Sequence, residues 1–122
     1  MNKKEIAVKF LEAAASGRVD EAYEKYVSPD FRHHNPYFKG DRESLRLAMK
    51  EAAVQSPNKV YEVKRALEDG NLVAVHGRIV LATNNKELAV IHILRFEGDK
   101  IVEEWEAGGE VPPSSPNENG VF

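Results

Sequence analysis

The sequence of 122 residues contains no cysteine. This absence excludes a disulfide framework, a thiolate zinc site and a thiol nucleophile, and it favours an intracellular, cytoplasmic protein. No apolar run approaches the roughly 20 residues that a membrane span needs. The first ten residues, MNKKEIAVKF, also lack the apolar stretch of a secretory signal. We therefore expect no membrane partner.

An excess of basic residues is also missing, since 17 Lys and Arg stand against 20 Asp and Glu and give a net charge of −3. Without a basic stripe we expect no nucleic-acid partner. What is present is an ordinary globular composition, 42% hydrophobic and 30% charged, which predicts a single domain over residues 1–122. Within it, residues 108–122 are rich in Gly, Pro, Ser and Asn and form a C-terminal tail.

Three helices are predicted in the first half of the chain. Apolar residues recur at helical spacing over 3–17, and again over 20–27, where Asp20 is a candidate N-cap. A third helix is predicted over 42–55, with Asp41 as its N-cap and Ser56-Pro57 at its end.

Four strands are predicted in the second half, over 59–68, 72–82, 87–97 and 100–107, because apolar and polar residues alternate there. Asp69-Gly70, residues 83–85 and Gly98-Asp99 are the predicted turns. Helices followed by an antiparallel meander indicate an α+β domain.

The lengths of these turns set an expected register. If the first and third loops have two residues and the second has three, four side chains form one row on one face of the sheet. The row consists of Val63, His76, His92 and Trp105, and Tyr61 and Glu103 share its face. Both faces of this sheet are apolar, whereas three short helices can cover only one. We therefore expect a homodimer that forms through the sheet.

Two opposed histidines can exchange protons with a ligand near neutral pH, and a tryptophan supplies a flat apolar wall. His76 and His92 beside Trp105 are therefore a candidate site, although each histidine can equally be an ordinary core or rim residue. A metal site built from His34, His76 and His92 is a further alternative, but it has no recognisable ligand spacing. We expect neither a metal nor an organic cofactor.

The segment FRHHNPYFKG, residues 31–40, has local reasons for only some of its residues. Asn35 and Pro36 begin a turn, and Gly40 permits a positive φ. In an extended segment His33 and His34 point to opposite sides. We expect His34 to face the cavity and His33 to face away from it.

Several stretches resemble the SnoaL-like polyketide cyclase family. FRHHNPYFKGDRESL resembles its QHNP…G segment, ILRFEGDKIVEEWE resembles its IFRFENGKIVEHWD, and PNENGVF resembles its NENxMF ending. The likeness runs from about residue 26 to 122 and is greatest to the branch named SnoaL-like predicted aldol-condensation enzymes. It implies a cystatin-like, nuclear-transport-factor-2-like fold: a cone-shaped, curved antiparallel sheet packed on three N-terminal helices, as in ketosteroid isomerase and scytalone dehydratase.

Within the QHNP segment, His34 matches the family histidine, Asn35 and Pro36 match the next two positions, and His33 replaces the glutamine. Trp105 matches the family tryptophan.

Two positions depart from the family. The family often has an aspartate, the expected base of the cyclases, where this chain has His92, and Glu106 replaces a second aspartate. The pair His76 and His92 instead resembles the two pocket histidines of scytalone dehydratase.

The resemblance and the residues together predict a small cofactor-free lyase or isomerase, of cyclase or dehydratase type. Its substrate is expected to be a carbonyl or enol-type small molecule bound in a cone-shaped pocket. His92 is the expected general base or acid, and His76 and His34 are expected to position the substrate oxygen. The predicted pocket residues are Trp105, Glu106, Asn35 and Tyr61.

Strand parity places the side chain of Glu106 on the other face of the sheet from His92, unless a bulge turns it inward. One alternative function is a non-catalytic small-molecule-binding or association module on the same fold. Another is an epoxide-hydrolase-like enzyme, which needs paired carboxylates facing the pocket. For that role the sequence offers Glu103 and, with a bulge, Glu106.

Overall fold

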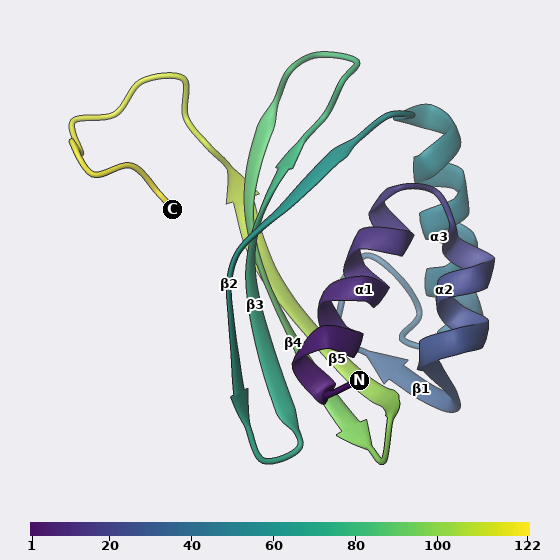
Figure 1. Ribbon diagram of the computed structural model, residues 1–122. Helices are drawn as coiled ribbons and strands as arrows, with labels where there is room; N and C mark the ends of the chain where they lie inside the picture. Colours follow the sequence, from purple (N-terminus) through teal and green to yellow (C-terminus); the bar gives the residue numbers. More distant parts are fainter.

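The computed structural model describes all 122 residues. The chain forms three helices, α1 (Lys3–Ala15), α2 (Val19–Tyr26) and α3 (Arg42–Gln55), and five strands, β1 (Val27–His33), β2 (Val60–Asp69), β3 (Leu72–Val80), β4 (Glu87–Glu97) and β5 (Lys100–Glu110). Figure 1 shows the helices against one face of a curved sheet, here named the inner face. The C-terminal tail lies on the other side, the outer face (Figure 1). The predicted α+β cone is confirmed.

Two aspartates stabilise the helices: Asp41 at the start of α3, and Asp20 between α2 and α3. Asp41 caps α3 as predicted, since its side chain accepts a hydrogen bond from the backbone N–H of Ser44 at 3.1 Å. The predicted cap at Asp20 is wrong because α2 begins at Val19, with Arg18 in the N-cap position. Asp20 instead pairs with Arg46 and with Lys50, at 2.8 Å from the latter, and so ties α2 to α3. None of the helices is long and apolar enough to cross a membrane.

The hydrophobic core fills the space between the helices and the inner face. An edge-to-face pair joins Phe10 of α1 to Tyr23 of α2, with ring centroids 5.7 Å apart. Alternate residues of the strands complete this core, because side chains of one strand point to opposite faces in turn. The fully buried strand residues are Val73, Val75, Leu94, Phe96 and Ile101.

A fifth strand, β1, was not predicted. It pairs in parallel with β5, so that the strand order is β1-β5-β4-β3-β2. Parallel pairing joins segments far apart in the sequence and leaves no local turn signal. At its C-terminal end β5 continues to Glu110, so the first three residues of the predicted tail, 108–110, belong to the sheet.

A bulge in β5 reverses the predicted alternation. The turn between β4 and β5 is as predicted, but Val102 is an extra residue that no β4 residue opposes. Such a bulge moves every following side chain to the other face. His92 therefore pairs with Glu106, where an unbroken register pairs it with Trp105. Glu104 and Glu106 share the inner face with His92, and Trp105 lies on the outer face.

The loop between β3 and β4 is longer than predicted. The Leu81 N–H donates to the carbonyl of Lys86 at 2.9 Å, which leaves a four-residue loop where three were expected. His76 consequently pairs with Ile91 and not with His92. His76 and His92 thus lie on opposite faces of the sheet.

The turn between β2 and β3 is also displaced. Asp69 pairs with Leu72, so the two-residue loop is Gly70-Asn71 and not Asp69-Gly70. A register irregularity between Val63 and Arg65 then shifts the pairing by one residue, so that Val63 pairs with Gly77, where His76 was expected. The predicted row of four side chains is wrong at each of its three junctions.

Candidate active site

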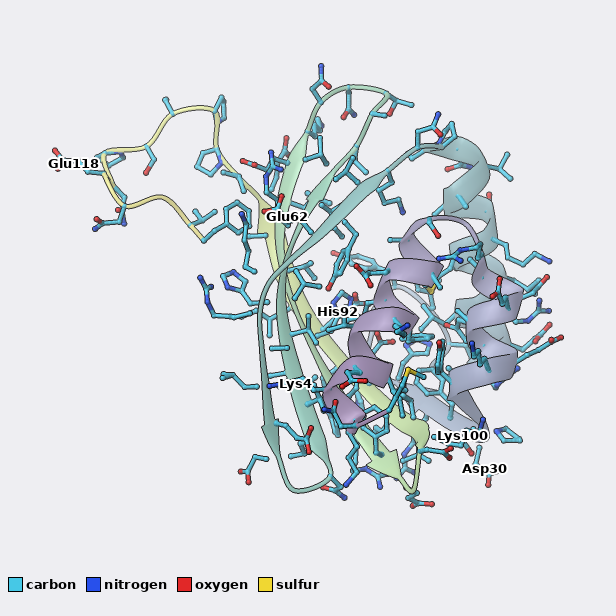
Figure 2. The ribbon with its side chains drawn as sticks, viewed as in Figure 1. Lys4, Asp30, Glu62, His92, Lys100 and Glu118 are labelled. Atoms are coloured by element: carbon cyan, nitrogen blue, oxygen red, sulfur yellow. The ribbon has the colours of Figure 1, made fainter.

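A cavity of about 290 Å³ lies between α1, α3 and the inner face of the sheet, and ten of its 15 lining residues are hydrophobic. Its polar groups come from the middle of the sheet and from the loop after β1. They are Asn35, Tyr61, His92, Glu104 and Glu106, with Lys59 preceding β2. A second hollow of about 480 Å³ shares the Asn35, His92 and Glu106 walls and extends along Gly108-Gly109. Figure 2 shows His92 on the side of the sheet that the helices cover.

His92 and two carboxylates form the centre of this site. Nε2 of His92 lies 3.3 Å from Oε2 of Glu106 and 3.9 Å from Oε1 of Glu104. The side-chain amide of Asn35 donates to Oε1 of Glu106 at 2.5 Å. Glu106 is therefore held on both oxygens, by an imidazole on one and by an amide on the other.

The surroundings shift the pKa values of these three groups in different directions. Burial raises the pKa of Glu104 to about 7, although the nearby His92 acts in the opposite direction. The hydrogen bond from His92 holds the pKa of Glu106 below its ordinary value. Burial disfavours a charged His92, but the hydrogen bond to Glu106 and the charge of Glu104 outweigh burial and raise its pKa. The favoured state is an imidazolium–carboxylate pair beside a carboxyl group that titrates near neutral pH.

Tyr61 lines the cavity with its ring, while its hydroxyl is closed off against Gly77. Its ring lies against Gly77, where a Cβ atom would be 2.8 Å from the hydroxyl oxygen. The hydroxyl is buried and has no hydrogen-bond partner, and burial raises the pKa of the phenol. Gly77 pairs with Val90, two residues before His92, so the hydroxyl is about 7 Å along the sheet from the level of His92.

Three predicted site residues lie on the outer face. His34 stacks on Trp105 with ring centroids 5.0 Å apart, and its Nε2 is 2.6 Å from Glu103. His76 stacks on the C-terminal Phe122 with ring centroids 5.8 Å apart. The expectation that His34, His76 and His92 converge on one cavity is wrong, and these three residues are not placed to ligate one metal ion.

Neither of the two neighbouring histidines of the HHNP segment lines the cavity. His33 pairs with Glu104 across β1 and β5, and like Glu104 it is buried, at 5% exposure. Its Nδ1 accepts a hydrogen bond from the backbone N–H of Asn35 at 3.1 Å. His34 is exposed on the other side. The expectation that His34 faces the cavity is therefore wrong, whereas His33 is buried in the core outside the cavity wall.

Glu104 is the site residue that the sequence reasoning missed. The run EEWE offers a carboxylate to the inner face in either register, because Glu103 and Glu104 are adjacent. The consecutive apolar pair Ile101-Val102, both buried, is the one local hint of a bulge. A bulge at that pair selects Glu104 and Glu106 for the cavity and leaves Glu103 to Arg95 on the outer face, at 3.0 Å.

Comparison with known proteins identifies the family. The model of the SnoaL-like domain family matches residues 7–104, and the chain belongs to this family. No curated protein sequence is significantly similar to the chain.

Solved structures share the fold at low identity. A cystatin-fold protein from Novosphingobium aromaticivorans is 23% identical, with a TM-score of 0.74, over 88% of this chain and 98% of that one. IdmH from Streptomyces antibioticus, a proposed polyketide cyclase, is 19% identical, with a TM-score of 0.72, over 88% and 92%. A proposed polyketide cyclase from Acidithiobacillus ferrooxidans is 15% identical, with a TM-score of 0.73, over 87% of each chain. At these identities the likeness shows the fold.

Proposed function

We propose that the protein is a small lyase or isomerase that uses only its own side chains for acid–base chemistry on a carbonyl or enol-type molecule. The observation that carries this proposal is the grouping in the cavity: Nε2 of His92 lies 3.3 Å from Glu106 and 3.9 Å from Glu104, and burial raises the pKa of Glu104 to about 7. A group that titrates near the working pH is suited to proton transfer in both directions. Its relatives IdmH and the A. ferrooxidans protein, described as proposed cyclases, support the same reaction class.

In the proposed reaction, the ionised Glu104 takes a proton from the carbon next to the substrate carbonyl. The positive charge of His92 stabilises the enolate that forms at the carbonyl oxygen. Glu106 and Asn35 hold His92 in its charged state and fixed orientation. Glu104 then returns the proton, either to another carbon, which is an isomerisation, or to a leaving hydroxyl, which is a dehydration.

This assignment differs from the one expected from sequence. His92 now stabilises the enolate, while Glu104 becomes the general base and acid, and Asn35, Tyr61 and Glu106 keep places in the cavity wall. His34, His76 and Trp105 receive no role, because all three lie on the outer face.

Deuterium exchange tests the proposal without a known substrate. A panel of ketones and 1,3-diketones in D₂O, followed by proton NMR, reports loss of the hydrogen next to the carbonyl. We expect exchange above background with the wild type, and a fall of roughly 10²- to 10⁴-fold in His92→Gln and in Glu104→Gln. His34→Ala and His76→Ala are matched controls on the outer face and should exchange at the wild-type rate.

Two results contradict the proposal. If exchange persists in both cavity variants, the assigned groups are wrong. If ligands of the panel raise the melting temperature but none exchanges or changes, the protein is a non-catalytic binding module on this fold.

An epoxide hydrolase is a second candidate, because the structure meets the condition that this function sets. Two carboxyl groups, Glu104 and Glu106, face the cavity beside each other, and their pKa values are displaced in opposite directions. Glu106 would take a proton from the attacking water, and protonated Glu104 would give one to the epoxide oxygen. Incorporation of ¹⁸O from labelled water into a diol, lost in Glu106→Gln, is the test.

We also propose that the protein is a homodimer that forms through the outer face of the sheet. The support is the apolar character of this face, where Ile91 and Ile93 of the central strand β4 are 46% and 37% exposed. A buried sheet normally has both faces covered, and the helices cover one.

A further inference from the structure

The turn that follows β1, residues 33–38, is anchored to its surroundings through its first two residues. The backbone N–H of His33 donates to the carbonyl of Gly40 at 3.0 Å. The backbone N–H of His34 donates to the carbonyl of Glu104, also at 3.0 Å. The turn is thus fixed to β5 at the residue that carries the proposed general base.

Every polar group of Asn35, in the middle of this turn, has a partner. Its backbone N–H donates to Nδ1 of His33 at 3.1 Å, and its carbonyl accepts from the N–H of Phe38 at 3.3 Å. Its side-chain oxygen accepts from the N–H of Tyr37 at 3.0 Å. The side-chain NH₂ is all that remains, and it donates to Glu106 at 2.5 Å. The orientation of the amide is therefore set, because its oxygen faces a donor and its nitrogen faces a carboxylate.

His33 is the acceptor that holds the backbone of Asn35. A ring nitrogen accepts a hydrogen bond only while it carries no proton, so the proton of the neutral ring is on Nε2. The ring is buried, and Nε2 has no partner. The bond from Asn35 is consequently the only hydrogen bond that this side chain makes.

The surroundings of His33 favour the neutral ring that this bond requires. Burial lowers the pKa of His33, and the neighbouring His34 acts in the same direction, whereas Glu106 of β5 and Asp41 before α3 oppose them. A protonated ring would place an N–H against the N–H of Asn35. It would also add a second cation that acts on Glu106.

We propose that His33 is a positioning residue of the active site. Its bond to the N–H of Asn35 sets the turn so that the Asn35 amide reaches Glu106. Glu106 in turn holds Nε2 of His92 at 3.3 Å. His33 lines neither hollow of the site, so it acts through Asn35 and not on the substrate. This inference rests on the proposed function for its effect on the reaction, and on the hydrogen bonds of the turn for its structural part.

The tautomer of His33 is the first test, and it needs no variant. Long-range ¹H–¹⁵N NMR of the labelled wild-type protein at pH 7 distinguishes a proton on Nε2 from a proton on Nδ1. We expect a neutral ring with its proton on Nε2. A proton on Nδ1, in a neutral or a charged ring, would overturn the inference, because that ring cannot accept from Asn35.

The side-chain NH₂ of Asn35 reports the effect of His33 directly. We expect its protons to exchange with water about 10-fold faster in His33→Leu than in the wild type, since the loss of a hydrogen bond has roughly that effect. In His33→Gln they should exchange at nearly the wild-type rate, because the glutamine oxygen can accept the same N–H. His34→Leu is the matched control, one residue along the chain and exposed, and it should behave as the wild type. Equal rates in His33→Leu and the wild type would overturn the inference.

His33→Leu should melt near the wild-type temperature, because leucine fills the buried position and removes an unpartnered Nε2. If it does not fold, His33→Phe is the second apolar variant. It keeps an aromatic ring beside Phe31, whose ring centroid is 6.4 Å from that of His33.

Turnover separates this inference from the proposed function. With a ketone whose deuterium exchange the wild type catalyses, His33→Leu should lower kcat by roughly 10- to 100-fold with little change in KM, the effect of a misplaced group. His33→Gln should restore most of that loss. In the background of Asn35→Ala, His33→Leu should have little further effect, and an undiminished effect there would overturn the inference. If no ketone exchanges while the tautomer and the amide behave as expected, only the proposed chemistry is refuted.

Discussion

The ring of Tyr61 occupies the space that a side chain at Gly77 would need. A Cβ atom at position 77 would lie 2.8 Å from the hydroxyl oxygen and 2.9 Å from two ring carbons of Tyr61. The glycine therefore allows the tyrosine to lie along the sheet, with its hydroxyl pointing from the level of Ile79 towards that of His92.

Replacing this glycine should displace the tyrosine. We expect Gly77→Ala to lower the free energy of unfolding by about 1–3 kcal/mol, the usual effect of overpacking, measured by chemical denaturation. Gly109→Ala is the control, because a Cβ there meets no atom within 4 Å. In the background of Tyr61→Ala the cost of Gly77→Ala should largely vanish. Equal costs for the two glycine variants would contradict this packing.

The raised pKa of Glu104 predicts a specific dependence of stability on pH. A carboxyl whose pKa is about 7 when folded and 4.5 in its unperturbed state binds its proton more tightly in the folded protein. Its stabilising contribution is thus complete below pH 4.5 and is lost as the pH rises to about 7.

Glu104→Gln should remove this loss. We expect the variant to gain stability relative to the wild type between pH 4.5 and 7, by on the order of 2 kcal/mol above pH 7. Denaturation curves at pH 4.5 and pH 8 measure the difference. Glu24→Gln, on the exposed side of α2, is the control. A gain that is the same at both pH values would show that ionisation of Glu104 is not its cause.

Titration of His92 by NMR tests its partnership with Glu106. In Glu106→Gln the pKa of His92 should fall, because burial is then opposed only by the charge of Glu104. Glu103→Gln removes a carboxylate of the outer face from the same strand and should leave the titration midpoint of His92 in place. Equal midpoints in all three proteins would remove the basis for an imidazolium in the site.

Sedimentation at micromolar concentrations tests the homodimer. We expect a dimer for the wild type, and dissociation to monomers in Ile93→Lys, because a charge would be buried at the centre of the interface. Leu47→Lys makes the same change at a 52% exposed position of α3 and should leave the dimer intact. A wild-type monomer at every concentration would contradict the proposal.

Much of the architecture was predictable because its signals are local. Helical spacing, the cap at Asp41 and the alternation of the four long strands all depend on residues within a few positions of one another. The strand β1 escaped prediction because its partner, β5, lies far away in the sequence and the pairing is parallel. The likeness to the SnoaL-like family supplied the overall cone that local patterns alone do not define.

The site was less predictable because it depends on the register of the strands. The loop before β4 was one residue longer than expected, and this moved His76 to the face opposite His92. The extra residue Val102 then exchanged Trp105 for Glu104 and Glu106. A one-residue error on a strand reverses every side chain beyond it, so one wrong loop length and one unforeseen bulge assigned His76 and Trp105 to the wrong face.

The bulge at Val102 also has a genetic consequence. A codon deletion at this position would keep every glutamate of β5 and almost the whole composition of the protein. It would nevertheless turn Glu104 and Glu106 outward and leave an aromatic ring between the helices and the sheet. A sequence alignment that places a gap one column away from Val102 would likewise assign the two cavity carboxylates to the wrong residues. In this chain, the number of residues between the β4–β5 turn and the glutamates of β5 therefore matters as much as the glutamates themselves.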